Sequence, residues 1–268
     1  QIKDATWTVN GLGRGDVPVV SFHEGGPAYG GTPSDAAVLA AIADLKARGL
    51  KVTLSPFLLM DVPDGNGLLD PYTQVAGQPA YPWRGRITCD PAPGVVGTPN
   101  LSVGIDAQID ALVGTAAAGD FSVGGNTINY AGPSEWSYRR FVLHHAHLAQ
   151  LAGGVDAFLI GSELRGLTTL RRSDDVFPFV DALGALATDV RSIVGGGTKI
   201  TYAADWSEYS GYQPPSAPAD KLFHLDPLWA HADIDAVAID NYMPLADWRD
   251  GTSHLDTADA TGPHDLDY

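Results

Sequence analysis

The sequence has a single cysteine, Cys89, and few basic residues. One thiol excludes an internal disulfide and a zinc site built from several cysteines, while it leaves the cellular compartment open. The chain has 16 Lys and Arg residues against 32 Asp and Glu residues, a formal net charge of −16. Because such a charge repels a phosphate backbone and an anionic membrane surface, direct binding to nucleic acid is not expected.

Long apolar runs and targeting signals are also missing. No run approaches the ~20 apolar residues that a membrane-spanning helix needs. The chain starts at Gln1 without Met and without a basic segment followed by an apolar one, so we expect a piece cut from a longer protein. No glycine-rich loop joins a strand to a helix with a following Lys and Ser or Thr, which argues against a phosphate-binding loop. The sequence indicates no cofactor.

The apolar residues follow an alternating pattern of strands and helices. A chain of 268 residues with 44% apolar content can bury one large core, so we predict a single domain over residues 1–268. Helices are predicted over residues 34–48, 134–152, 178–194 and 225–231, with Ser34 and Ser134 as the caps of the first two. Five buried strands are predicted over residues 17–22, 51–60, 157–161, 199–204 and 234–239. Short strand, loop and helix units of this kind indicate an α/β fold with a parallel sheet.

One long segment interrupts this pattern. Residues 61–133 are rich in Pro, Gly and Asp and follow the carboxyl end of a predicted strand. A long excursion at that position is typical of a functional loop or lid. Inside it we expect a small helix over residues 103–117 and a hairpin over residues 121–130 around Gly124, Gly125 and Asn126.

Polar and aromatic residues gather where the predicted strands end. In a closed parallel barrel all strand ends of this kind meet at one mouth. Two carboxylates facing one another there can divide the roles of acid and base, and aromatic rings beside them can stack on sugars, which together suggests glycoside chemistry. The residues at the strand ends are His23, Glu24, Asp61, Glu163, Asp205, Trp206, Glu208, Asp240 and Tyr242. Trp83, Trp206, Tyr209, Tyr242 and Trp248 are the candidate stacking residues.

Each of these residues also has a simpler interpretation. Glu163 could be a solvated carboxylate at a strand end. Asp205 and Asp240 could accept hydrogen bonds from the amides of the following turns, as short acids often do. The aromatic residues could pack in the core or at the rim of a barrel. All of these alternatives stay open from the residues alone.

Two further clusters invite a metal interpretation. His144 and His147 share a helix face and His145 lies between them, but no carboxylate follows at a matching spacing, so packing against a neighbouring helix is favoured. A second cluster resembles a calcium loop without the alternating ligand spacing of an EF-hand, and a plain acidic turn is favoured there. Its members are Asp61, Asp64, Asn66 and Asp70. No metal site is predicted.

Several long motifs resemble one family. These motifs span residues 26–35, 77–90, 135–140, 158–168 and 202–209. In this order they resemble the glycoside-hydrolase-like TIM-barrel domain of the large tail hub proteins of gene transfer agents and related phages of alphaproteobacteria. The resemblance implies an α/β fold of the TIM (β/α)8 type, incomplete in this chain, which holds about strands two to six with a long insertion after the third.

The same resemblance carries expectations about function. It implies a domain that acts on cell-envelope polysaccharide during attachment or DNA delivery; the alternative is a non-catalytic carbohydrate-binding or purely structural tail or baseplate domain. The implied partners are an envelope glycan and other tail proteins, the implied location is the tail of the particle, and a homotrimer is the implied assembly.

More distantly, the strand that ends in Glu163 resembles the fourth strand of clan A glycoside hydrolases. That resemblance implies that Glu163 is the general acid/base of a retaining enzyme. The clan has Asn before this Glu, whereas Ser162 stands here. The clan's nucleophile is a Glu at the end of the seventh strand, which we expect beyond Tyr268, so this chain alone is not expected to be active. Tyr242 corresponds to the aromatic residue of the sixth strand beside that nucleophile.

Overall fold

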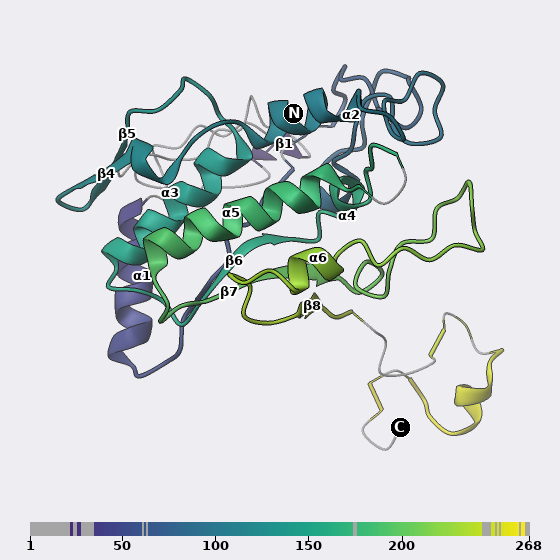
Figure 1. The fold of residues 1–268 in the computed structure, drawn as a ribbon. Coiled ribbons are helices and arrows are strands. Elements are labelled where there is room, and N and C mark those ends of the chain that lie inside the picture. The colour runs from purple at the N-terminus through teal and green to yellow at the C-terminus, as the bar shows by residue number, and fades with distance from the viewer. Residues whose placement is uncertain are drawn as a thin grey trace.

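The computed structural model has a parallel sheet of four strands at its centre (Figure 1). In spatial order the strands are β3 (Thr53–Leu54), β6 (Ala157–Ser162), β7 (Lys199–Asp205) and β8 (Ala238–Asp240). The structure describes residues 22–23, 26–27, 35–60, 62, 64–173, 176–242, 248–249, 251, 253–262 and 264–265. Within these ranges β3 and β8 each pair with one neighbour, so the described sheet is open at both edges.

Helices connect these strands and cover the sheet. They are α1 (Asp35–Ala47), α3 (Tyr138–Leu151), α5 (Pro178–Val194) and the short α4 (Arg165–Thr168) and α6 (Asp226–Trp229). The long helices α3 and α5 lie side by side along the sheet (Figure 1). Their apolar faces, the strands β6 and β7 and part of α2 form one continuous core. The alternation of parallel strands and helices confirms the predicted α/β class.

The sequence predicted α5 with its observed bounds. Pro178 stands in its first turn, where a missing backbone N–H is tolerated, and Leu183, Leu186 and Val190 form part of its buried face. Its apolar residues recur at helical spacing over the full length of the helix, which is why the pattern was sufficient.

Helix α3 begins later than predicted. The predicted cap Ser134 is wrong, because Ser137 is the residue whose Oγ accepts the hydrogen bond from the N–H of Arg140, at 3.2 Å. Glu135 explains the difference: its carboxylate accepts from the Ser137 hydroxyl at 2.6 Å and from the N–H of Ala116 at 2.9 Å. These contacts hold the segment before Ser137 as a loop.

The outer strands are shorter than their apolar runs. The strand predicted over residues 51–60 is reduced to β3, because Pro56 has no N–H to donate to a sheet. The strand predicted over residues 234–239 is reduced to β8. The strand predicted over residues 17–22 lies outside the described residues except for Phe22, which belongs to the small antiparallel pair of β1 (Phe22–His23) and β2 (Gly26–Pro27).

Aspartates fix the strand register at the amino ends of the sheet. Asp156 Oδ2 accepts from the N–H of Val52 at 2.7 Å, which ties the start of β6 to β3. Asp235 Oδ2 accepts from the N–H of Ile200 at 2.8 Å, which ties the approach to β8 to β7. The amino ends of the strands are thus occupied by structural carboxylates, and the opposite ends are free for a functional site.

The long segment after β3 contains the two predicted small elements. Helix α2 (Ile105–Val113) is shorter at both ends than predicted, and β4 (Phe121–Gly124) pairs with β5 (Thr127–Tyr130) as the predicted hairpin. The segment packs closely against α4, because a Cβ atom at Gly166 would overlap the carbonyl oxygen of Ile87. This contact holds the 3-10 turn Arg84–Arg86 against α4, the short helix that follows β6.

Two features lie apart from the sheet. The last described residues, with the 3-10 turn Leu255–Ala258, lie away from the strands at the lower right of Figure 1. Among the residues that the structure describes, no helix is both long enough and apolar enough to cross a membrane.

Candidate functional site at the carboxyl end of β6

Glu163 follows the last residue of β6 in an unusual backbone conformation. Its φ angle is 51°, in the left-handed region that residues with a Cβ rarely adopt. Its N–H donates to the carbonyl oxygen of Ala203 at 2.9 Å, which continues the pairing with β7. A conformation of this kind costs on the order of 1–3 kcal/mol and persists where the surroundings fix it, typically at functional sites. The residue is 4% exposed, so its carboxylate depends on protein partners.

Those partners come from the long segment after β3. The indole Nε1–H of Trp83 donates to Glu163 Oε2 at 2.6 Å, and Arg84 Nη2 lies 2.9 Å from the same oxygen. The guanidinium of Arg84 is 3.8 Å from the centre of the Phe57 ring, which excludes water from its other face. Thus the segment predicted as a loop or lid closes on the carboxylate at the carboxyl end of β6.

A second carboxylate shares the same arginine. Ser162 Oγ accepts from Arg84 Nη2 at 2.7 Å and donates its proton to Asp240 Oδ2. Asp240 Oδ2 also lies 3.7 Å from Arg84 Nη2. Glu163 Oε2 lies 2.9 Å and Asp240 Oδ2 lies 3.7 Å from the same nitrogen, Arg84 Nη2. The distance between these two carboxylate oxygens therefore cannot exceed the sum of those two distances. Ser162, which replaces the Asn of the clan pattern, joins these two strand ends instead.

Behind Glu163, a third carboxyl group is buried. Glu208 is 1% exposed and accepts from the hydroxyl groups of Thr168 and Tyr202 and from the N–H of Asp205, the last at 3.0 Å. Burial raises the pKa of Glu208 to about 7, although these hydrogen bonds act in the opposite direction. Both oxygens of Glu208 already accept hydrogen bonds from the protein. Glu208 was predicted to bind substrate, but it lies beneath the site and not on its surface.

The other predicted residues of the neighbouring strand ends differ in exposure. Asp205 is buried, and its Oδ1 accepts from the N–H of Ser207 at 2.9 Å, as the interpretation of a turn cap predicted. Trp206 is 46% exposed and Tyr242 is 71% exposed, so both rings can reach a ligand. Trp248 lies in the separate C-terminal segment, where its ring contacts that of His254.

Three predicted residues cannot be assigned to the site. Only the backbone of His23, in β1, is described, and Glu24 and Asp61 lie outside the described residues. Conversely, sequence reasoning did not select Arg84 or Ser162, which hold the two carboxylates. The one feature of the sequence that points to Arg84 is its place beside Trp83 in the motif of residues 77–90. That motif carries the family resemblance but does not by itself show which side chain reaches the sheet.

The histidines of α3 have separate structural partners. His144 Nε2 lies 3.0 Å from Asp35 Oδ1, and His147 Nε2 bonds the carbonyl oxygen of Ala118 at 3.1 Å. His145 Nδ1 bonds the carbonyl oxygen of Phe141 at 2.8 Å, and burial lowers its pKa to about 4. His144 thus links α3 to α1, and His147 links it to the residues just before the hairpin.

In the acidic turn, the side chains of Asp64 and Asn66 accept hydrogen bonds from backbone amides. Asp64 Oδ1 accepts from the N–H of Gly65 at 2.9 Å, and Asn66 Oδ1 accepts from the N–H of Leu68 at 3.1 Å. Within the described ranges, no group of three or more His, Cys, Asp or Glu side chains is arranged to hold a metal ion.

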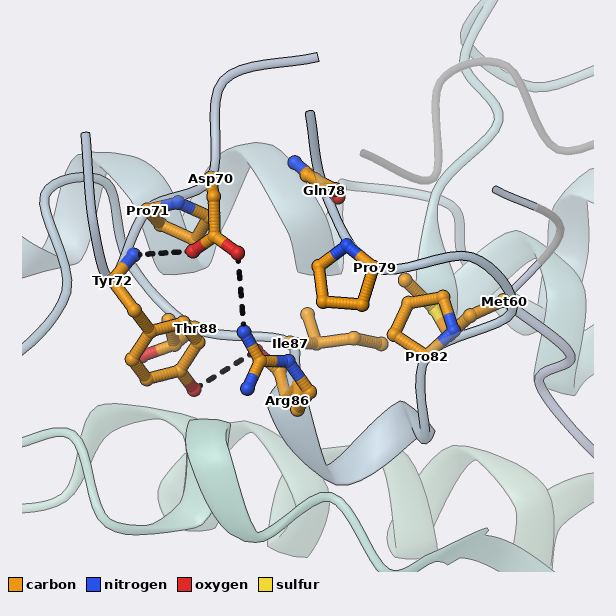
Figure 2. A pocket seen from close by; sticks show the side chains of 10 residues that line it. All are labelled: Met60, Asp70, Pro71, Tyr72, Gln78, Pro79, Pro82, Arg86, Ile87 and Thr88. Carbon is orange, nitrogen blue, oxygen red and sulfur yellow. Dashed lines mark hydrogen bonds and ion pairs between the residues drawn. The ribbon is translucent and has the colours of Figure 1, made fainter. Parts of the chain in front are cut away.

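A small pocket is lined in part by Arg86, the last residue of the Arg84–Arg86 turn (Figure 2). Its volume is about 90 Å³, against roughly 300–1,000 Å³ for ligand pockets. Asp70 accepts from the N–H of Tyr72 at 2.8 Å and pairs with Arg86 at 3.3 Å, so the polar groups of this pocket bind one another. It is lined by Met60, Asp70, Pro71, Tyr72, Gln78, Pro79, Pro82, Arg86, Ile87 and Thr88. The residues that line the pocket support the turn that carries Arg84.

The parallel strands, the helices between them and the carboxylates at one end of the sheet define a TIM-barrel-like domain. Residues 136–268 match the family model of the GTA TIM-barrel-like domain. The predicted fold class and the predicted family resemblance are thereby confirmed.

Two solved structures are also similar to the chain. One is described as a complex structure of GH113 beta-1,4-mannanase, with 18% identity and a TM-score of 0.41 over 85% of this chain and 49% of that chain. The other is a structure of GH113 beta-1,4-mannanase, with 17% identity and a TM-score of 0.39 over 81% of this chain and 45% of that chain. The chain spans about half the length of these solved structures. A comparison with curated protein sequences finds no match.

Proposed function

We propose that the chain is the glycan-directed barrel domain of a phage-type tail hub and acts on cell-envelope polysaccharide during attachment or DNA delivery. The observation that carries this proposal is the placement of Glu163. It stands at the carboxyl end of a central parallel strand, beside an indole N–H donor and near a second carboxylate. Side chains at that position of a barrel form the active site, whereas those at the amino ends serve stability.

The proposed chemistry is glycoside hydrolysis with Glu163 as the general acid/base. In such a reaction a carboxylic acid gives its proton to the leaving glycosidic oxygen while a second carboxylate attacks the sugar carbon. Asp240 is already bound by Ser162 and Arg84, so we assign it to charge balance and ligand binding. The nucleophile remains the one predicted from the seventh strand.

The exposed aromatic rings support a carbohydrate ligand. Trp83 is 40% exposed, Trp206 46% and Tyr242 71%, and all three follow the carboxyl side of the sheet or contact it. An aromatic face packs on the apolar face of a sugar ring, and its polar edge still bonds a hydroxyl group. We assign these rings to polysaccharide binding.

The place of the domain in a particle rests on its family. The GTA TIM-barrel-like name supports association with a gene transfer agent particle. We place the domain in the tail, next to other tail and baseplate proteins and as a homotrimer. The net charge of −16 supports contact with a glycan in preference to direct contact with the DNA that passes through a tail.

A comparison of the wild-type protein with Glu163→Gln tests the catalytic role. The assay measures release of reducing sugar from purified envelope polysaccharide by the whole barrel-containing protein. A loss on the order of 10² to 10⁴-fold is expected, because the variant has no proton to give. Asp44→Asn changes an exposed carboxylate on α1 and serves as the control. Equal release by wild type and Glu163→Gln would remove Glu163 from the mechanism.

The geometry also favours a second function, carbohydrate binding without turnover. Glu163 is held by Arg84, and Ser162 stands where the clan has Asn, so the residues next to the carboxylate differ from those of the enzymes. In this case Trp206→Ala weakens binding to immobilised polysaccharide roughly tenfold by loss of stacking. Trp136→Ala is the matched control, since Trp136 is 39% exposed but lies against Arg140. Unchanged affinity in Trp206→Ala would count against this function.

A further inference from the structure

The carboxyl group of Glu208 is joined to the turn that carries Glu163. Tyr202, which is fully buried in β7, donates its hydroxyl proton to Glu208 at 3.1 Å from Oε1 and 3.2 Å from Oε2. The same Tyr202 oxygen accepts from the N–H of Leu164 at 2.7 Å. Leu164 is the residue directly after Glu163, so one hydroxyl group connects the buried carboxyl to the backbone of the proposed acid/base.

A second contact holds the far end of the same turn. The hydroxyl group of Thr168, the last residue of α4, donates to Glu208 Oε1. The chain from Leu164 to Thr168 is therefore bound to Glu208 at both ends. The N–H of Asp205 is the third donor to Glu208. A carboxylate has enough acceptor sites for all three donors.

None of these groups can touch a ligand. Glu208 is 1% exposed, and Tyr202 and Thr168 are 0% exposed. Their position in β7 and α4 and in the turn after β7 separates them from the exposed indole of Trp83, which contacts Glu163. A network that is closed in this way, and that ends at the peptide N–H directly after one functional residue, acts through that residue.

We propose that Glu208 is a positioning residue, which holds Glu163 in its left-handed conformation through Tyr202 and Thr168. This inference rests on the proposed function for its catalytic consequence, but the geometry itself can be tested without a substrate. Glu163 needs such support, because its φ of 51° is unfavourable for a residue with a Cβ. The neighbouring residues of β6 and β7 fix its N–H, and the Glu208 network fixes the N–H that follows.

The indole N–H of Trp83 reports on the position of Glu163. It donates to Glu163 Oε2 at 2.6 Å, so its proton resonance depends on where that oxygen lies. In the ¹⁵N-labelled full chain, Trp83→Phe identifies this resonance among the six tryptophans. We expect the resonance to move toward the position of a free indole in Glu208→Gln and in Tyr202→Phe.

Asp235→Asn is the matched control for this measurement. Asp235 is also a structural carboxylate of the sheet, but it bonds the N–H of Ile200 at the opposite end of β7. Its substitution should leave the Trp83 resonance in place. An unchanged resonance in both test variants, or an equal movement in Asp235→Asn, would overturn the proposal. If Glu208→Gln does not fold, Tyr202→Phe decides the question alone.

Where the barrel-containing protein cleaves envelope polysaccharide, the same variants separate positioning from binding. A misplaced acid/base lowers kcat, on the order of 10²-fold, with KM within about twofold of wild type. A rise in KM on the order of 10²-fold with kcat unchanged would contradict a positioning role. If no form of the protein cleaves the glycan, the proposed hydrolase fails, and the Trp83 resonance still decides whether Glu208 positions Glu163.

Discussion

Arg84 is the residue on which the polar contacts of the site converge. It donates to the carbonyl oxygen and the hydroxyl group of Ser162, at 2.8 and 2.7 Å, and lies between Glu163 and Asp240. Its side chain is 8% exposed and that of Glu163 is 5% exposed. A charge removed from such a pair leaves its partner buried without compensation.

We therefore expect Arg84→Met to lower the free energy of unfolding by about 3 kcal/mol. Urea denaturation at pH 7, followed by circular dichroism, measures the change. Arg48→Met removes an ion pair with Asp44 whose side chains are 67% and 60% exposed. This control should lose less than about 1 kcal/mol. Losses of the same size in the two variants would show that the buried pair has no special role.

Glu208 gives the fold a pH dependence of its own. Burial raises its pKa from 4.5 to about 7 in the folded protein, so the folded state keeps a proton that the unfolded chain releases. Its contribution to stability is therefore present below about pH 4.5 and falls as the pH rises to about 7. Glu208→Gln cannot ionise, and we expect its stability to improve relative to wild type between pH 5 and pH 8.

The measurement is the difference in unfolding free energy between wild type and Glu208→Gln at these two pH values. Asp44→Asn provides the reference, because its exposed carboxylate should give a nearly constant difference over the same range. A constant difference for Glu208→Gln would mean that Glu208 titrates as it does in water.

At the scale of elements, β6 depends on a glycine for its contact with α3. A Cβ atom at Gly161 would overlap the hydroxyl oxygen of Tyr138, which donates to the carbonyl oxygen of Ile160 at 2.5 Å. Burial raises the pKa of Tyr138 above its usual range, so this hydroxyl stays neutral and keeps its proton. The strand and the helix therefore meet through a polar contact inside an apolar core.

We expect Gly161→Ala to destabilise the protein by about 1–3 kcal/mol through overpacking. In a Tyr138→Phe background the same substitution should be less harmful, because the overlapping oxygen is absent. Gly196→Ala is the control, since nothing lies within 4 Å of a Cβ at that position. Thermal unfolding of the single and double variants gives the coupling between the two sites, and strict additivity would contradict the proposed contact.

The elements that the sequence predicted best are those with their own repeating pattern. Helix α5 and the hairpin of β4 and β5 have regular apolar spacing and turn residues, so local sequence was sufficient. The start of α3 could not be predicted in this way, because Glu135, which accepts from the Ser137 hydroxyl, is itself held by a backbone N–H about twenty positions earlier. Tertiary contacts of this range leave no mark on a local pattern.

At the scale of the whole molecule, the sequence predicted the site only in part. Glu163 could be selected because it follows a buried strand, and Asp240 because it follows another. Their common partner Arg84 lies 78 positions before Ser162, in a 3-10 turn of a long segment that has no regular apolar pattern. Neither periodicity nor strand order predicts which side chain of such a segment will reach the sheet.

The charge of the whole chain also affects stability. Acidic residues outnumber basic ones by 32 to 16, so the excess negative side chains repel one another in the folded chain at neutral pH. Raising NaCl from about 0.02 M to about 0.5 M shortens the range of this repulsion and should raise the unfolding free energy on the order of 1 kcal/mol. KCl at equal ionic strength should act equally. A fall in stability with salt would indicate that attractive ion pairs such as that of Asp235 outweigh the net repulsion.

The hydrogen bond between Trp83 and Glu163 links occupancy of the site to an optical signal. A sugar hydroxyl that binds Glu163 Oε2 competes with the indole N–H for that carboxylate oxygen. Trp83 is also 40% exposed, so its surroundings change when a ligand covers it. Intrinsic fluorescence of the unlabelled protein therefore responds to ligand binding before any bond is broken, and the part of the response that comes from Trp83 disappears in Trp83→Phe.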